Sequence, residues 1–427
     1  MSISNSIRLT LNLKDKNIKL KDNFVEEVNI KGIDTLVYSG TLSPDAPSFC
    51  PKCGCINKNY DIIKHGSKTV NIKMPRMSNR KVILRLKKQR YYCKQCQKTF
   101  LAQSNCVDFN HSISRNTYHS CVLQMKEKIS ITDIARHHDI SHTMVNNYLK
   151  DLSKKFVVDK HYLPEHLSFD EFKSVKSCAS KMSFIFTDAI NHKVIDIVYN
   201  RQLSHLKSYF FSYPKEARDQ VQTICIDMYA PYVSLIKSCF PNAKIILDRF
   251  HIIQLLSRSL NKTRVQAMNT NKTHYNKLKR YWRILLKDYE DINQTTYQHY
   301  TCFKYKMSEV EVLNELLRSD KELETTYWYY QKLKLSFNHK NSRSLIDNLK
   351  NYPPELSKSM KTSIHSLLKF ETELENSLSY KYSNGAIEGT NNLIKVIKRI
   401  AFAYRSYENF RSRILLITNT MVRLEYK

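Results

Sequence analysis

The most informative stretch of this chain is Ser383-Asn384-Gly385-Ala386-Ile387-Glu388-Gly389-Thr390-Asn391-Asn392. It places one carboxylate between two of the six glycines in the whole sequence. It runs directly into Leu393-Ile394-Lys395-Val396-Ile397-Lys398-Arg399, whose spacing predicts an amphipathic helix with a basic face. Glycine gives the backbone freedom beside the carboxylate, and a cationic helix attracts a phosphodiester. The segment therefore suits one ligand of a metal site that accepts such a substrate.

The sequence upstream of this segment predicts a sheet. From Leu167 to Tyr199, three short apolar runs joined by polar turns are typical of an antiparallel meander. Two further strand-like runs, 221–227 and 243–248, alternate with helical segments near 206–213 and 231–240, as in a mixed α/β sheet.

The rest of the C-terminal half has the periodicity of helices. This pattern covers about 250 to 380, and a final helical stretch covers about 386 to 424. We expect Trp282 and Trp328, the two tryptophans of the chain, to anchor the core of the first of these regions.

Two aspartates in the predicted strands can supply further metal ligands. Cleavage of a phosphodiester by two metal ions needs carboxylates that hold the ions about 3.5–4 Å apart, and Mg²⁺ or Mn²⁺ favours hard oxygen ligands. Asp170 follows Leu167-Ser168-Phe169 in the first strand, and Asp227 follows Ile226 at the end of the fourth. If those strands are neighbours, both carboxylates meet at the centre of the sheet, and Glu388 is the third ligand.

Each of these carboxylates is weak evidence alone, because an aspartate at a strand end is more often a cap or a turn residue. Asp188 and Asp196 lie in similar strands. The role of Asp188 stays open, and we expect Asp196 to be structural or exposed. Glu171, next to Asp170, should point to the opposite face of its strand.

Two C-x2-C pairs, separated by residues 54–92, predict a zinc site. Tetrahedral zinc takes four thiolates, and each pair supplies two. A β-hairpin around 70–74 and 82–92 fits between the pairs, and we expect one structural zinc ion to stabilise this lysine-rich domain. Cys55 and Cys106 have no partner at ligand spacing, so we expect neither to bind metal. The four expected ligands are Cys50, Cys53, Cys93 and Cys96.

Residues 129–149 predict two short helices joined by a turn at Asp139-Ile140, with Ser141 as the N-cap of the second helix. This pattern is that of a helix-turn-helix, in which the second helix contacts DNA. The residues expected to face inward are Ile131, Ile134, Ala135, Val145, Tyr148 and Leu149. The outward residues that can reach base edges or phosphates are His142, Thr143, Asn146 and Asn147.

Composition and charge limit the classes of partner. The chain has 69 Lys and Arg against 39 Asp and Glu, and its net charge of +30 favours nucleic acid first and an anionic membrane second. A coding bias toward Lys, Asn, Ile and Tyr accounts for part of this excess. No apolar run approaches the roughly 20 residues that span a bilayer, so we expect a cytoplasmic, nucleoid-associated protein with no membrane contact. Paired cysteines in that compartment indicate metal rather than disulfides.

Four motifs resemble successive motifs of one known family. They are Leu167-Ser-Phe-Asp-Glu-Phe172, Ile226-Asp-Met-Tyr-Ala-Pro-Tyr232, Phe240-Pro-Asn-Ala-Lys-Ile-Ile-Leu-Asp-Arg-Phe-His251 and the segment from Ser383 to Arg399. Together with Tyr92-Cys-Lys-Gln-Cys-Gln-Lys-Thr-Phe100, they are similar to motifs of the bacterial insertion-sequence transposases of the ISL-three family. The resemblance covers nearly all of the chain beyond residue 47.

The resemblance implies a DDE catalytic domain of RNase H-like fold, in which Asp170, Asp227 and Glu388 are catalytic and bind two Mg²⁺ or Mn²⁺ ions. It also implies a large, mainly helical insertion at about 255–380. Asp248-Arg-Phe-His251 matches a D-x-x-H motif of such enzymes, and His251 either orients a phosphate, or supports the metal site, or packs as an ordinary helix residue. Ala403 departs from the pattern, because the family is expected to have glycine there.

The sequence therefore predicts a multidomain protein. Its parts are a polar N-terminal segment and linker at 1–47, helical or partly disordered, a zinc ribbon-like domain at 48–107, a helix-turn-helix domain at 110–156 and an α/β catalytic domain at 163–424.

The predicted function is that of a DNA transposase. We expect the zinc and helix-turn-helix domains to bind the terminal inverted repeats as double-stranded DNA, and Lys395, Lys398 and Arg399 to hold the DNA backbone near the active site. The catalytic domain would cut the element ends and join them to target DNA, in a homodimer or higher oligomer on DNA. Two alternatives remain open: a catalytically silent DNA-binding regulator, and a metal-dependent nuclease that cuts without joining.

Overall fold

The computed structural model describes residues 3–178, 180–401 and 404–418. Ala403, where the sequence departs from the family pattern, lies outside these residues. The chain forms two compact units, each with its own hydrophobic core. We call them the first unit (Met1–Val157 with Ile394–Lys427) and the second unit (Val158–Leu393). The sequence assigned everything from 163 to 424 to one domain, whereas contacts group the part after Leu393 with the N-terminal residues.

A five-stranded sheet forms the N-terminal part of the first unit. Its strands are β1 (Ile18–Ile30), β2 (Ile33–Leu42), β3 (Ile62–Met77), β4 (Arg80–Cys93) and β5 (Lys98–Leu101). They follow the order β1-β2-β4-β3, and β5 pairs with the end of β4. β2 and β4 run parallel, and the other pairs run antiparallel. The predicted hairpin between the cysteine pairs is thus confirmed as β3 and β4.

The expectation of a helical or partly disordered segment at 1–47 is wrong for most of its length. After a short helix, α1 (Ile3–Thr10), the segment forms β1 and β2. Ile18, Val37 and Leu42 are fully buried in these strands. Lysines and acidic residues between such positions make the segment polar in composition, and this hides the alternation of a half-buried strand.

Three helices follow the sheet: α2 (Arg115–Gln124), α3 (Ile131–His137) and α4 (His142–Lys155). Each begins after a serine whose hydroxyl accepts a hydrogen bond from a backbone N–H, and Ser141 caps α4 as predicted. Asp139, in the turn before α4, has a φ of 53°. All six residues expected to face inward are buried.

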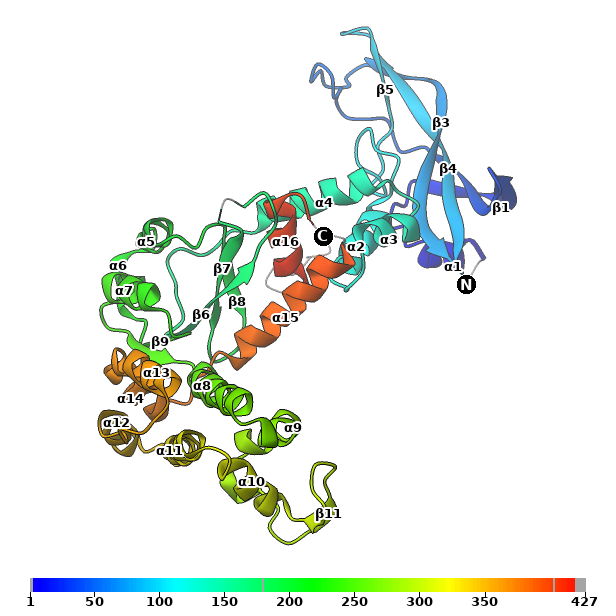
Figure 1. The fold of residues 1–427 in the computed structure, drawn as a ribbon. Helices are drawn as coiled ribbons and strands as arrows, with labels where there is room; N and C mark the ends of the chain where they lie inside the picture. The colour runs from blue at the N-terminus through cyan, green and yellow to red at the C-terminus, as the bar shows by residue number, and fades with distance from the viewer. Residues whose placement is uncertain (1–2, 179, 402–403, 419–427) are drawn as a thin grey trace. The chain divides into compact units, whose positions relative to one another are not determined.

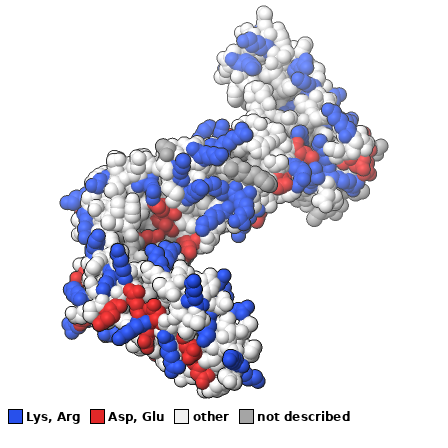
Figure 2. Space-filling view, viewed as in Figure 1, with Lys and Arg blue, Asp and Glu red and all other residues white. Residues whose placement is uncertain are grey.

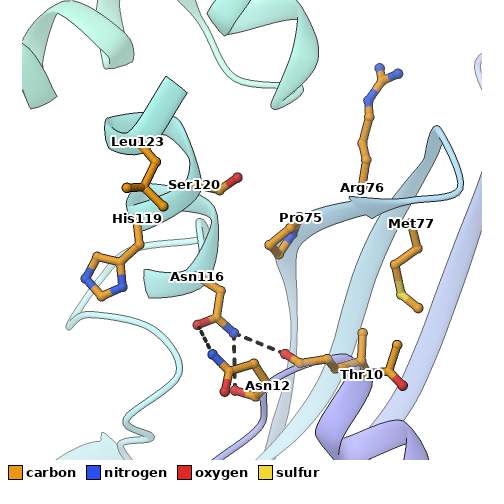
Figure 3. Close-up of a pocket in the computed structure, with 10 residues that line it drawn as sticks. Thr10, Asn12, Pro75, Arg76, Met77, Asn116, His119, Ser120 and Leu123 are labelled. Atoms are coloured by element: carbon orange, nitrogen blue, oxygen red, sulfur yellow. Dashed lines mark hydrogen bonds between the residues drawn. The ribbon is translucent and has the colours of Figure 1, made fainter. Parts of the chain in front are cut away.

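The hairpin contacts the turn between α3 and α4. Arg76 donates to both carboxylate oxygens of Asp139, at 2.8 and 2.9 Å, and Lys73 Nζ donates to the Asp139 carbonyl at 2.7 Å. Beside this contact, Asn12 and Asn116 bond to each other next to a hollow of about 280 Å³, lined by the ends of α1, β3 and α2 (Figure 3). The sheet and the helices of the first unit therefore pack together.

A C-terminal helix, α16 (Tyr407–Ile417), packs against α4 and completes the helical part of the first unit. Arg413 is fully buried, and its Nη2 donates to the carbonyls of Glu127 and Ile129 at 3.0 and 2.8 Å. Asn409 donates to Asn146 Oδ1 of α4 at 3.4 Å.

A second five-stranded sheet lies in the second unit. Its strands are β6 (His166–Lys173), β7 (Met182–Asp188), β8 (Val194–Val198), β9 (Thr223–Ile226) and β10 (Lys244–Leu247). They follow the order β10-β9-β6-β7-β8, with β6, β7 and β8 antiparallel and β9 parallel to both β6 and β10. The predicted meander is confirmed, and the first and fourth strands are neighbours, which was the condition for Asp170 and Asp227 to meet.

Aromatic side chains hold this sheet against helices. Figure 1 shows α5 (Leu203–Phe211), α6 (Lys215–Asp219) and α7 (Ala230–Cys239) grouped together beside the sheet. Phe169 of β6 stacks on Phe210 of α5 at 5.3 Å and contacts Phe184 of β7 at 5.0 Å, and all three rings are fully buried. This packing fixes the part of β6 that precedes Asp170.

The region after β10 is mainly helical, as predicted. Its helices are α8 (Arg249–Thr270), α9 (Tyr275–Arg280), α10 (Glu309–Leu317), α11 (Lys321–Asn338), α12 (Ser342–Lys350), α13 (Lys358–Leu368) and α14 (Glu371–Ser379), with 3₁₀ turns at 272–274, 284–286 and 289–291. A short hairpin of β11 (Gln298–His299) and β12 (Lys306–Met307) interrupts them. α14 covers the edge strand β10, because Leu247 N donates to Ser377 Oγ at 2.9 Å and Asn376 donates to the Ile245 carbonyl at 3.0 Å.

The expectation that tryptophans anchor this region is wrong. Trp328 is 42% exposed, and Trp282 is only partly buried. Tyr327 and Tyr330 of α11 are buried instead, and the Tyr330 hydroxyl lies 2.9 Å from the hydroxyl of Ser257 on α8. Helical spacing turns Trp328 away from the face of α11 that packs on α8.

The segment quoted first forms α15 (Gly385–Ile400), and the predicted amphipathic helix is confirmed. Ile387, Ile394 and Ile397 are buried, whereas Lys395 and Arg399 are exposed. Figure 2 shows Lys and Arg side chains spread over both units on the face in view, with a concentration of Asp and Glu over the helices α10 to α14. None of the helices in the described residues combines the length and apolar character needed to cross a membrane.

Candidate functional site

Asp170 and Asp227 lie where two neighbouring strands part. The parallel pairing of β6 with β9 ends at Ser168↔Cys225. Asp170 lies two residues further along β6, and Asp227 directly follows β9. Burial, together with the negative charge of Asp227, raises the pKa of Asp170 to about 7. A half-buried carboxylate pair with this mutual repulsion fits a divalent cation, whose charge would offset it.

Asn384 fills the fork between the parting strands. Its Nδ2 donates to the Phe169 carbonyl of β6 at 3.2 Å and to Asp227 Oδ1 at 3.3 Å. Its backbone N–H donates to Asp248 Oδ1 at 3.3 Å. The residue before α15 therefore bonds to a carbonyl within β6 and to the carboxylates that follow β9 and β10, and it is 2% exposed.

Asp248 and His251, the predicted supporting pair, adjoin Asp227. His251 Nδ1 lies 3.0 Å from both Asp227 Oδ1 and Asp248 Oδ2. These contacts with Asp227 and Asp248 raise the pKa of His251 to about 10, so the ring is protonated near neutral pH. One ligand atom of each residue lies within 4.8 Å of the others, and Asp248 is almost fully buried. His251 therefore acts as an internal cation beside the aspartates.

Asn391 ties α15 to the other aspartate. Its Nδ2 donates to Asp170 Oδ2 at 2.6 Å, and the residue is 7% exposed. Residues 384, 388 and 391 lie on one face of a helix, at spacings of four and three. Glu388 therefore lies between two residues that bond to the aspartates, on the face of α15 turned toward them.

Glu388 itself is exposed. Among the described residues, its carboxylate does not belong to the group of ligand atoms within 4.8 Å that includes Asp227. The structure thus groups Asp227, Asp248 and His251, and neither Asp170 nor Glu388 belongs to that group. Asp170 lines the same hollow as Asp227 and His251.

Glu171 is occupied by other partners. Both of its carboxylate oxygens accept from Arg201 Nη1, and the Tyr232 hydroxyl donates to Oε2 at 3.0 Å. Asp196, which is buried, accepts from the Tyr209 hydroxyl and the backbone N–H of Ile197, and so has the structural role expected for it. Asp188 accepts from backbone N–H groups in the turn after β7.

A hollow of about 300 Å³ adjoins the carboxylates. It is lined by the middle of β6, by Asp227 and the residues that follow it, and by one face of α8. Its lining residues are Phe169, Asp170, Glu171, Asp227, Met228, Tyr229, Tyr232, His251, Gln254, Leu255 and Arg258. The hollow is therefore acidic at the aspartates and carries cationic side chains along α8.

The four predicted cysteine ligands form a separate cluster in the first unit. One sulfur of each lies within 4.8 Å of the others, and the Cys50–Cys96 and Cys53–Cys93 Sγ distances are both 3.8 Å. A tetrahedron with Zn–S bonds of ~2.3 Å has sulfurs about 3.8 Å apart. Hydrogen bonding by backbone N–H groups, chiefly that of Cys96, lowers the pKa of Cys93 to about 6, whereas burial raises the pKa of Cys96 to about 11. The spacing of the four sulfurs therefore carries the assignment. The residues present therefore fit Zn²⁺.

Cys55 lies beside this cluster. Its Sγ is 3.3 Å from Cys93 Sγ, although its sulfur does not belong to the group of four. Cys106 lies 3.2 Å from the hydroxyl of Ser104 instead. Sequence spacing alone did not indicate the approach of Cys55.

The predicted DNA-contacting residues of α4 differ in exposure. His142, Thr143 and Asn147 are exposed, whereas Asn146 is partly buried. Asn146 Nδ2 lies 3.0 Å from His142 Nδ1, and its Oδ1 accepts from Asn409. On α15, Lys395 and Arg399 are exposed and Lys398 is partly buried.

Sequence reasoning missed Asn384 and Asn391 as parts of the site. A signal for both was present, because they flank Glu388 at spacings of four and three residues. What the sequence lacked was the partner of each amide, which only the approach of α15 to β6 and β9 reveals.

Two models of known protein families match this chain. A model of ISL-three-type transposases, described as transposase, matches residues 167–414, and a second, described as the zinc-finger of the transposases of IS204, IS1001, IS1096 and IS1165, matches residues 46–96. The transposase for insertion sequence element IS1001 of Bordetella parapertussis is 23% identical over 354 residues, which cover 78% of this chain and 80% of that protein.

A shorter similarity points to a different description. A protein of Lactococcus lactis subsp. lactis with the name ATP-dependent protease is 32% identical over 110 residues, which cover 26% of this chain and 35% of that protein. That match spans about a quarter of this chain and about a third of the other protein.

Proposed function

The chain belongs to the ISL-three family of insertion-sequence transposases, and we propose that Asp170, Asp227 and Glu388 form the centre at which it cuts the ends of its element and joins them to target DNA. One observation carries this proposal. The two asparagines that flank Glu388 on α15 each donate a hydrogen bond to one of the two aspartates. The helix that bears the third carboxylate is therefore tied to both of the others.

The topology supports an RNase H-like reading of the second unit. Its central sheet has a three-stranded antiparallel meander followed by two parallel strands on the side of β6. The first aspartate lies in the central strand and the second directly after its parallel neighbour. A helical insertion separates the second aspartate from Glu388.

Asp170, Asp227 and Glu388 would hold two Mg²⁺ or Mn²⁺ ions. Such ions activate the attacking oxygen and stabilise the leaving oxygen of a phosphodiester. The chain's own groups have distinct tasks. Asn384 and Asn391 orient the aspartates, and the protonated His251, anchored by Asp248, offsets negative charge at Asp227.

DNA recognition falls to the first unit. We infer that α3 and α4 act as a helix-turn-helix and that α4, with the zinc ribbon, reads the terminal inverted repeats. The tight turn at Asp139 and the exposed side chains at the start of α4 support this assignment. Assembly of a homodimer or higher oligomer on the DNA stays a prediction.

Conservative substitutions test the catalytic assignment. Asp170→Asn, Asp227→Asn and Glu388→Gln each remove a ligand charge at nearly constant shape. Each should abolish Mg²⁺-dependent cleavage of a labelled terminal repeat and leave binding of that repeat largely intact. Asp188→Asn is the matched control, because Asp188 serves a turn and should retain cleavage. Near-wild-type cleavage by one of the three variants would remove that residue from the site.

The same assay separates the alternatives. A wild-type protein that binds the repeat but does not cut it is a regulator. One that cuts but yields no joined product with target DNA is a nuclease. Strand-transfer products that depend on all three carboxylates support the transposase.

A further inference from the structure

One face of α8 forms a wall of the hollow beside the aspartates. His251, Gln254 and Arg258 all line it. Their spacings of three and four residues place them in one stripe along the helix. From His251 to Arg258 the stripe extends about 10 Å along the helix axis, at 1.5 Å per residue. The hollow therefore continues along α8, away from the carboxylates.

Arg258 is the cation at the far end of this stripe. It is exposed, and among the described residues no carboxylate lies within 4.0 Å of its guanidinium. Two other arginines of the second unit have partners: Arg201 pairs with Glu171, and Arg264 is buried and donates to the Leu278 carbonyl at 2.8 Å. Arg258 thus lines the hollow as an exposed cation, on the helix that also carries His251.

An aromatic side chain lines the same hollow. Tyr229, two residues after Asp227, is 43% exposed. Its ring meets Tyr232 edge-on at 4.9 Å, and Tyr232 is held by its hydrogen bond to Glu171, which in turn is held by Arg201. Tyr229 therefore rests on a fixed support and offers an exposed ring to a ligand.

We propose that this hollow binds one nucleotide of the DNA strand next to the cleaved bond, with Arg258 on its phosphate and Tyr229 against its sugar or base. The inference rests on the proposed function and names the part of the substrate that this site takes. A guanidinium matches the geometry of a phosphate better than other cations do. Aromatic rings pack on bases of any sequence. The distance along α8 assigns Arg258 to a phosphate beside the reacting one.

A double-mutant cycle between Arg258 and each DNA phosphate near the cut tests the contact of Arg258 with a phosphate. Full-length, zinc-loaded protein is assayed with Mg²⁺ on terminal-repeat duplexes that carry one uncharged methylphosphonate at each position flanking the cut. We expect Arg258→Ala to reduce cleavage efficiency by about 10- to 150-fold, the usual loss of a charged hydrogen bond. At one flanking position the methylphosphonate should impose the same loss on the wild type and add nothing to Arg258→Ala. Arg258→Lys should recover part of the loss.

Lys262→Ala is the matched control. Lys262 is exposed on α8 one turn beyond Arg258 and does not line the hollow. The losses in cleavage efficiency caused by Lys262→Ala and by the methylphosphonate should add at every position. A corresponding cycle combines Tyr229→Ala with an abasic site at each flanking nucleotide. We expect Tyr229→Ala to reduce cleavage efficiency by about 5- to 150-fold. At one position the abasic site should cause the same loss in the wild type and no further loss in Tyr229→Ala.

The outcomes separate this inference from the proposed function. Additive losses at every phosphate for Arg258→Ala, or an equal loss in Lys262→Ala, would overturn the nucleotide site even if cleavage still requires Asp170. A wild-type protein that cuts no duplex would instead overturn the proposed function. Terminal-repeat binding at wild-type strength by Arg258→Ala verifies that the variant is folded.

Discussion

At the scale of single residues, the amide of Asn391 joins the helix that bears Glu388 to the strand that bears Asp170. It donates to the carboxylate over 2.6 Å from a position that is 7% exposed. The amide oxygen of the same side chain is buried and has no hydrogen-bond partner among the described residues. Asp170 is thus the hydrogen-bond partner of this side chain.

We expect Asn391→Ala to lower the cleavage rate about 10- to 150-fold, because a hydrogen bond to a charged group contributes about 1.5–3 kcal/mol. Asn391→Asp should be more damaging, since it sets a second negative charge against Asp170. A purely structural role would leave the metal requirement unchanged, whereas a positioning role shifts the Mg²⁺ concentration for half-maximal cleavage upward. Thr390→Ala, whose hydroxyl bonds within its own helix, is the control.

The zinc cluster allows a comparison of cysteines that lie close together. We expect purified wild-type protein to contain one zinc ion per chain, and Cys93→Ser to lose it, because four thiolates complete the tetrahedral site. Cys55→Ser should keep its zinc, although Cys55 Sγ lies 3.3 Å from Cys93 Sγ. Metal analysis of the variants measures both. Zinc loss in Cys55→Ser would instead assign Cys55, in place of Cys53, as a zinc ligand.

At the scale of elements, α4 and α15 present different chemistry to DNA. The exposed start of α4 carries His142, Thr143 and Asn147, which can contact bases, whereas α15 carries exposed Lys395 and Arg399. Asn146 is held by His142 and by Asn409 of α16, so it is less available than its neighbour.

We expect Asn147→Ala to narrow the difference in affinity between cognate and scrambled duplexes by about 1–3 kcal/mol, with little change in salt dependence. Arg399→Ala should weaken binding to both duplexes alike and reduce the slope of affinity against salt by about 0.9. Titrations at several salt concentrations measure both quantities. If Asn147→Ala keeps full specificity, the reading element lies elsewhere, with the zinc ribbon as the next candidate.

At the scale of the whole molecule, the two units have separate cores and separate metal chemistry. The sulfur cluster lies among residues packed on the first sheet, and the carboxylates lie at the end of the second sheet. The helical part of the first unit is completed by α16, which the chain reaches only after the second unit.

Removal of zinc by a chelator should therefore act on one unit. We expect faster amide hydrogen exchange in β3, β4 and β5, because Cys93 ends β4 and pairs with the first residue of β3, and Cys96 lies two residues before β5. Exchange in β6 to β10 should stay unchanged, since the core of the second unit includes no residue of the cluster. Equal acceleration in both sheets, measured by mass spectrometry, would contradict independent units.

Local patterns in the sequence predicted much of this protein. The serine cap and inward residues of α4, the meander β6–β8 and the amphipathic α15 depend on interactions between residues near in sequence or on simple periodicity, so residue types alone indicate them. The four-cysteine cluster joins two distant pairs, but the C-x2-C spacing within each pair indicates it. The same reasoning failed where polar composition masked alternation, in β1 and β2, and where residue size was taken for burial, at Trp328.

Only the tertiary structure decided how distant residues meet. The sequence by itself determined that Asp170, Asp227 and Glu388 are candidates and that Glu388 opens a helix. It could not determine that Asn384 fills the fork between β6 and β9, that Asn391 bonds to Asp170 or that α16 joins the first unit, because each contact spans more than 150 residues. Such contacts arise from the packing of whole elements against one another, and no local pattern records which element will be the partner.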